Sequence, residues 1–201
     1  MTYLIIGIIL AGGLAFYLTS WKNNSKANGK TSADQPLDSN KVKKTKVQEN
    51  PYPGLRNQSL SVTPDQLQLK LDDSKTSVYG IVMDWDIGKA VATVVAFQTG
   101  DASLYISAGQ IYIGGYAHEN VKNAALVFVK EGQQHLTNAT LTTETPLPDK
   151  DCVRFYFLTN KGKYFLQEKV ENIENKKSDL TNLFDLGNRV ITEYRITTND
   201  K

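Results

Sequence analysis

The chain has 201 residues, a formal net charge of +2 and a single cysteine, Cys152. The charge is unevenly placed: residues 22–50 carry +4 and residues 1–21 carry no charged side chain, so residues 51–201 carry −2. A net negative domain argues against nucleic-acid binding, because nucleic-acid readers usually present a basic folded face. One cysteine excludes an internal disulfide and disfavours structural zinc, which is normally held by cysteine and histidine.

The chain opens with an apolar run over residues 3–21, bounded by Tyr3 and Trp21. As a helix it would span roughly 28 Å, close to the ~30 Å hydrocarbon core of a bilayer. No basic residue precedes the run and no A-x-A pattern follows it, so a cleaved signal peptide is disfavoured. A buried core helix is also disfavoured, because a long polar segment follows at once. The sequence predicts an uncleaved transmembrane helix over residues 1–21 that acts as a signal-anchor.

Orientation follows from the lysines Lys22, Lys26 and Lys30, which come directly after the run. Positive residues stay on the cytoplasmic side. We therefore expect a single-pass protein of the bacterial inner (cytoplasmic) membrane, with its N-terminus outside and its soluble domain in the cytoplasm.

The segment 22–50 is rich in lysine, asparagine and serine and lacks aromatic residues. Such a composition predicts a disordered linker. Its "KVKKTK" motif either attracts anionic lipid of the bilayer or simply keeps the linker solvated.

Residues 51–201 are long enough for one soluble domain. "PYPG" at 51–54 reads as a loop, and Thr63, Pro64 and Gln66 give the start signature of a short helix. Alternating or continuous apolar residues then predict strands, because a half-buried strand has a period of two. These strands cover residues 78–87, 89–98 and 104–107, and residues 110–115 form either a further strand or a bent extension.

A buried helix is predicted from His118 or Glu119 to about Gly132, followed by a hairpin over residues 152–170. Ser178 is expected to cap a final helix, whose apolar stripe runs to Tyr194. The order β-β-β-α-β-β-α predicts an α+β domain of two layers, with an antiparallel sheet of about five strands and two main helices.

The best candidate binding site is the stretch "GQIYIGGYAHENV", where Gly114 and Gly115 precede a helix start and His118 and Glu119 lie at the same point. Backbone N–H groups at a helix start can hold an anion. The pattern is neither G-x-G-x-x-G nor a P-loop, and paired glycines there usually make a tight turn. We refer to residues 114–119 as the glycine turn.

Other chemistry is weakly indicated. His118 and His135 are the only histidines and do not form an H-E-x-x-H motif, so neither a metal nor a cofactor is expected. Asp84 and Asp86 share a strand face and could act as an acid–base pair, but are expected to face solvent opposite an apolar face. Cys152 is expected to pack as a small hydrophobe.

The motifs "GDASLYIS" and "GGYAHENV", with "LPDKDCVRFYFLTNKGK" and "GNRVITEYR", resemble an uncharacterised bacterial domain family with a GDASLYxS…GGxxHExV core. The resemblance covers residues 55–195 and implies no catalytic residues. Gln110, Ile111 and Tyr112 stand where that family is richer in glycine.

Three functions remain open at this point. The first is a non-enzymatic module that docks a protein partner or a second copy on an exposed sheet edge or face, where aromatics such as Tyr79, Trp85 and Tyr105 could lie. The second is a small-ligand or catalytic domain that uses the glycine turn. The third is an immunity-type protein that neutralises a toxin.

Overall fold

The structure is a computed structural model that describes residues 50–199. The chain divides between Asn50 and Pro51, and the elements below belong to the unit Pro51–Lys201. The predicted anchor and linker over residues 1–49 lie outside the described part. Within residues 50–199, no helix has the length and apolar character needed to cross a bilayer.

The domain combines helices with a single antiparallel sheet, which confirms the predicted α+β class. The helices are α2 (Tyr52–Leu60), α3 (Glu119–Gly132), α4 (Val170–Glu174) and α5 (Thr181–Asn199). The short 3-10 segments are η1 (Gly115–Ala117) and η2 (Gln133–Asn138). The strands are β1 (Val78–Asp86), β2 (Val91–Phe97), β3 (Ala102–Ile106), β4 (Ile111–Ile113), β5 (Thr140–Thr142), β6 (Cys152–Thr159) and β7 (Gly162–Lys169).

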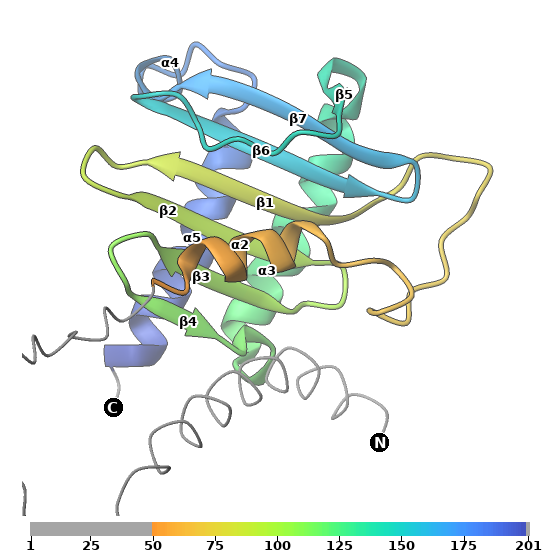
Figure 1. Cartoon of the computed structure of the whole chain (residues 1–201), viewed down its shortest axis with the longest axis horizontal. Coiled ribbons are helices and arrows are strands. Elements are labelled where there is room, and N and C mark those ends of the chain that lie inside the picture. The colour runs from red at the N-terminus through yellow and green to blue at the C-terminus, as the bar shows by residue number, and fades with distance from the viewer. Residues whose placement is uncertain (1–49, 200–201) are drawn as a thin grey trace, which may run out of the picture. The chain divides into compact units, whose positions relative to one another are not determined.

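The seven strands lie in the order β4-β3-β2-β1-β6-β7-β5. Every neighbouring pair is antiparallel, and short turns join β1 to β2, β2 to β3, β3 to β4 and β6 to β7. The longest strand, β1, lies at the centre between β2 and β6, while three-residue strands form both edges. Figure 1 shows α3 and α5 side by side behind the sheet and α2 across its front.

The face toward α3 and α5 is the main apolar core. Ile81, Met83, Phe155 and Phe157 from the central strands are all fully buried there, against Phe128 of α3. The alternation predicted for residues 78–87 is therefore present at Ile81, Met83 and Trp85, whose side chains all lie on this face. Tyr79 lies on the other face, because an irregularity between Val78 and Gly80 shifts the register with β6.

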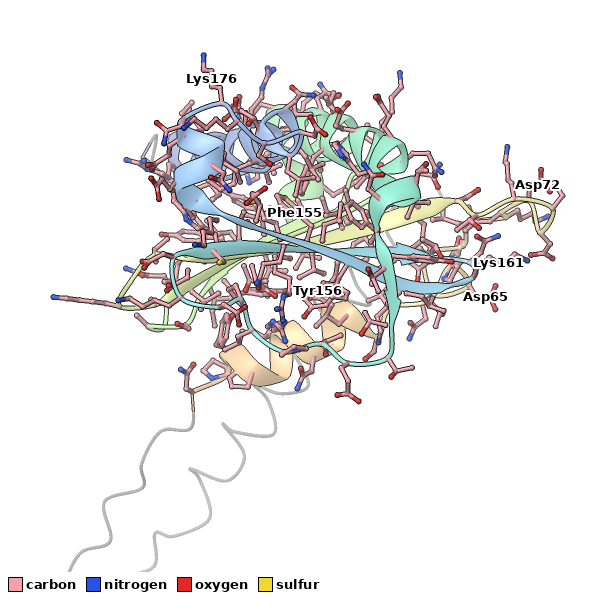
Figure 2. The ribbon with its side chains drawn as sticks, turned by 90° about the horizontal axis from the view of Figure 1, so that it is seen from above. Asp65, Asp72, Phe155, Tyr156, Lys161 and Lys176 are labelled. Atoms are coloured by element: carbon pink, nitrogen blue, oxygen red, sulfur yellow. The ribbon has the colours of Figure 1, made fainter. Side chains whose placement is uncertain are left out.

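The opposite face is covered by α2, the segment after it and a strap that we define as residues 143–150. A second apolar cluster lies beneath them and contains Tyr52, Leu60, Val82 and Tyr156. Figure 2 shows Phe155 on the α3 and α5 side of the sheet and Tyr156 on the α2 side, although the two residues are adjacent in the chain.

Several predicted details were wrong. The sheet has seven strands, not about five, because β4 is a separate strand and β5 pairs with the far edge of β7. The "PYPG" stretch is not a loop but the start of α2, with proline in its first turn where a missing N–H costs nothing. Because α2 covers the second sheet face, the domain is not a simple two-layer structure.

The helix predicted at Thr63 is reduced to turns. The capping bonds form as expected: the N–H of Thr63 donates to Oε1 of Gln66 at 2.8 Å, and the N–H of Gln66 donates to Oγ1 of Thr63 at 3.4 Å. Gln68 then adopts a left-handed φ of 56°, which ends any helix.

Candidate functional site

The glycine turn joins β4 to α3 through η1, as the sequence predicts. Gly114 has a φ of 87°, a left-handed conformation that glycine adopts without a steric cost. His118 then adopts an extended conformation as the N-cap residue of α3, without a side-chain capping bond.

Gly115 is buried in a close contact between three elements. A Cβ at this position would meet the Tyr194 hydroxyl of α5, Val121 of α3 and Ala102 of β3. The Tyr194 hydroxyl donates to the carbonyl of Ala102 at 2.5 Å, and burial raises the pKa of that hydroxyl. Gly115 is therefore required by packing, which favours the tight-turn interpretation of the paired glycines.

The two titratable residues of the turn do not point to a shared ligand. The Glu119 carboxylate is largely exposed and lies 3.7 Å from the ammonium of Lys122 one helical turn later. This is the arrangement of a solvated ion pair on a helix, and the acid also favours the positive end of the helix dipole. His118 is half-buried, and its side chain makes no capping bond to α3.

Asp84 is the largest departure from the sequence-based expectation. It is not solvent-facing but fully buried on the α2 side of β1. Its Oδ2 accepts hydrogen bonds from Nε and Nη2 of Arg56 at 3.0 and 2.7 Å, and its Oδ1 accepts one from the hydroxyl of Thr93 at 2.5 Å. Tyr52 contacts the same Thr93 hydroxyl at 2.8 Å. The carboxylate is thus fully occupied in joining α2 to β1 and β2.

The strap is held over this network by three donors. Arg56 donates to the carbonyls of Thr145 and Pro146, Arg154 donates to those of Pro146 and Leu147, and the Tyr156 hydroxyl donates to Pro146. These hydrogen bonds tie the strap to α2 and to β6. The Nε of Arg154 is itself buried without a hydrogen-bond partner in the described structure.

Sequence reasoning missed Arg56, Thr93 and Arg154 because none belongs to a recognisable motif. One signal was present: Tyr52, Arg56, Ser59 and Leu60 follow helical spacing, and all four are buried. A stripe that mixes polar and apolar residues does not register as a hydrophobic period.

The remaining candidates are also separated. One carboxylate oxygen of Asp86 accepts a hydrogen bond from the N–H of Gly88, and the other accepts one from the N–H of Asp151. Asp86 therefore makes local structural bonds and does not form a pair with Asp84. His118 and His135 lie at opposite ends of α3, whose length is about 21 Å.

Burial raises the pKa of the Cys152 thiol, which disfavours a reactive thiolate. Within residues 50–199, no three His, Cys, Asp or Glu side chains gather as a metal site would require.

β4 forms one of the two edges of the sheet. The β3–β4 register pairs Tyr112 with Leu104 and Ile111 with Tyr105, and the Ile106 N–H bonds to the Gln110 carbonyl. Because antiparallel partners alternate, Ile111 and Ile113 direct their N–H and C=O groups away from β3. Residues 102–117 contain no charged side chain.

Comparison of the chain with protein families, with curated proteins and with solved structures found no match.

Proposed function

We propose that the chain is a single-pass protein of the inner (cytoplasmic) membrane whose cytoplasmic domain, residues 51–201, is a non-enzymatic protein-interaction module. The apolar run between Tyr3 and Trp21 and the lysines that follow it support the anchor and its orientation. The partner is a protein that adds a strand to the β4 edge.

The observation that carries the proposal is the edge of β4, which no other strand within residues 50–199 covers. Natural sheets normally block an edge with lysine, proline or a covering element. Here Ile111, Tyr112 and Ile113 form the strand, no charge lies within residues 102–117, and the outward N–H and C=O groups of Ile111 and Ile113 offer a template for a further strand.

The distribution of reactive side chains also supports binding over catalysis. Asp84 is neutralised by Arg56, Glu119 lies beside Lys122, and Cys152 is buried at the start of β6. A catalytic acid or base has to reach a substrate in a cleft. Asp84 and Cys152 are buried parts of the fold, and Glu119 forms an exposed ion pair on a helix surface.

Photo-crosslinking in native membranes tests the docking edge. A photoreactive phenylalanine analogue replaces exposed Gln110, beside β4, and in a matched control it replaces Leu141 of β5, the other three-residue edge strand, which is 59% exposed. We expect a discrete adduct from position 110 and none from position 141. A mass of two chains would identify a second copy as the partner, and a larger or smaller mass would identify another protein. No adduct from position 110, or equal adducts from both positions, would contradict the proposal.

Topology is tested separately. An alkaline phosphatase fusion after Lys201 is expected to be inactive, a fluorescent cytoplasmic reporter at the same place is expected to be active, and the chain is expected to stay in the membrane pellet after alkaline carbonate. An active phosphatase would reverse the orientation, and release by carbonate would remove the anchor.

A further inference from the structure

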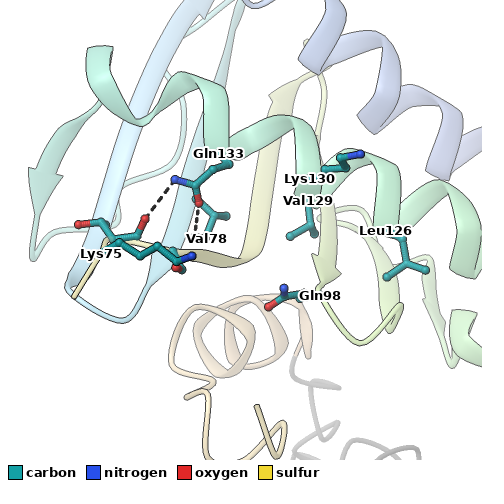
Figure 3. A pocket seen from close by; sticks show the side chains of 9 residues that line it. Lys75, Val78, Gln98, Leu126, Val129, Lys130 and Gln133 are labelled. Atoms are coloured by element: carbon teal, nitrogen blue, oxygen red, sulfur yellow. Dashed lines mark hydrogen bonds between the residues drawn. The ribbon is translucent and has the colours of Figure 1, made fainter. Parts of the chain in front are cut away.

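A cavity of about 560 Å³ lies between α3 and the segment that leads into β1 (Figure 3). Small-molecule sites typically have ~300–1,000 Å³, so this volume suits a small organic ligand and exceeds what a single inorganic ion needs. The lining comes from three parts of the chain: residues 75–78, the end of β2, and one side of α3. Its members are Lys75, Thr76, Ser77, Val78, Gln98, Leu126, Val129, Lys130 and Gln133.

The wall formed by residues 75–78 is held by two amide side chains. Gln133 accepts a hydrogen bond from the N–H of Val78 at 2.9 Å and donates one to the carbonyl of Thr76 at 3.1 Å, as Figure 3 shows. Asn160, from the β6–β7 turn, accepts from the N–H of Ser77 at 2.9 Å and donates to the carbonyl of Lys75 at 3.0 Å. The wall is therefore fixed to both neighbouring elements, which preorganises the cavity for a ligand.

The cavity has an apolar side and a polar side. Val78 and Val129 are buried and Leu126 is half-buried, so they offer an apolar surface. Thr76, Ser77 and Gln98 contribute hydroxyl and amide groups for which no side-chain hydrogen bond is found within the described residues. Such a combination of apolar surface with a few uncommitted donors is typical of a ligand site.

The charge of the lining is entirely positive. Lys75 and Lys130 line the cavity and no acidic residue does, although residues 51–201 as a whole carry −2. The Lys75 ammonium lies 3.9 Å from Asp72, but both groups are exposed, and such pairs contribute little. Lys130 makes no ion pair with any described residue. An anionic ligand can therefore reach two cations: Lys130, and Lys75, whose one ion pair is solvent-exposed.

We infer that this cavity binds a small phosphate monoester, with Lys75 and Lys130 on the phosphate and Leu126, Val129 and Val78 against the organic part. A phosphate monoester carries about −1.5 to −2 near pH 7, which matches two ammonium groups, whereas a carboxylate carries only −1. Its several acceptor oxygens also suit the hydroxyl and amide donors of Thr76, Ser77 and Gln98. The same chemistry occurs on a soluble metabolite and on the headgroup of phosphatidic acid.

Calorimetric titration of the full chain in neutral detergent micelles tests the inference, with glycerol 3-phosphate as the probe and chloride keeping the ionic strength constant. We expect saturable binding that the double variant Lys75→Gln/Lys130→Gln weakens at least tenfold. The control Lys89→Gln/Lys150→Gln removes the same charge from two exposed lysines elsewhere and is expected to leave the affinity within twofold. A third variant, Leu126→Glu, places an acid at the cavity and is expected to abolish binding while the thermal midpoint stays near that of the unmodified chain.

A second arm separates the two sources of phosphate. Vesicles of phosphatidylcholine with and without phosphatidic acid are titrated with the same variants. Saturable binding of glycerol 3-phosphate that depends on Lys75 and Lys130 supports a soluble ligand, and binding confined to phosphatidic acid with the same dependence supports a lipid headgroup. Absence of both, or equal losses in the cavity and control variants, would overturn the inference. Neither result bears on docking at β4, which lies at the sheet edge.

Discussion

Adjacent residues of β6 lie in two different kinds of interior. Phe155 and Phe157 pack with α3 and α5 in the main apolar core. Arg154 and Tyr156 face the strap on the α2 side and donate hydrogen bonds to it. Burial of apolar side chains closes one face of the sheet. The other face combines an apolar cluster with the buried Arg56–Asp84 ion pair and its hydrogen bonds. Since both faces are covered, the surface left for a partner strand is an edge.

The ion pair is the strongest test of this contrast. Asp84→Ala leaves the guanidinium of Arg56 buried without its carboxylate, and we expect a loss of about 3–5 kcal/mol in the free energy of unfolding. The double variant Arg56→Met/Asp84→Ala removes both charges and should cost clearly less than the single variant. Urea unfolding of the unmodified chain, the two single variants Asp84→Ala and Arg56→Met, and the double variant gives the coupling energy of the pair. Equal losses for Asp84→Ala and the double variant would show that the pair is not coupled.

The apolar face should respond differently. Leu183→Ala removes a fully buried side chain of α5 and should cost about 2–5 kcal/mol through lost burial and the cavity left behind. No charge is exposed or orphaned, so the loss should be the same in low and high salt. A loss that varies with salt would contradict the assignment of this face as an apolar core.

The glycine turn gives a smaller but more pointed prediction. Gly115→Ala introduces a Cβ against Tyr194, Val121 and Ala102, and the overpacking should cost about 1–3 kcal/mol. The partner variant Tyr194→Phe removes the hydroxyl that is closest to this Cβ. In that background Gly115→Ala should cost less, as thermal unfolding can measure. An unchanged penalty would mean that Tyr194 does not set the requirement for glycine.

The turn between β2 and β3 gives the smallest expected effect, through pH. Burial raises the pKa of Asp101, and the hydrogen bond from Thr99 offsets part of this rise. Because the folded pKa lies above the unfolded one, the folded state binds more protons in between, and stability falls as pH rises through that window. Asp101→Asn should remove this component, so its stability relative to the unmodified chain should improve from pH 4 to pH 7. Parallel pH profiles from urea unfolding would contradict the assignment.

The two faces also differ in how far the sequence predicts them. The alternation from Ile81 to Trp85 and the helical stripe that ends at Tyr194 identify the apolar face directly, because a period of two or 3.6 is a local property. The other face depends on the contact between Arg56 and Asp84, which are 28 residues apart in the sequence. No local sequence pattern predicts such a contact. Asp84 was expected in solvent because an isolated carboxylate on a strand usually is.

The candidate site was predictable only in part. Paired glycines before a helix locate the turn, but the packing that requires Gly115 includes the hydroxyl of Tyr194, far along the chain. The edge strands were harder, since β5 has three residues and its pairing with β7 is set by tertiary structure. The cavity beside α3 is lined by residues from 75 to 133 that no sequence motif unites.

The central claim, that both faces are closed while the β4 edge is open, is tested most directly by residue-resolved hydrogen exchange on the isolated full chain. The amides of Ile111 and Ile113 should exchange rapidly, while those of Tyr112, which pairs with β3, and of Asp84 in β1 should be strongly protected. Slow exchange at Ile111 and Ile113 would mean that the edge is already covered, and rapid exchange at Asp84 would mean that the α2 face is open; either result would contradict the account.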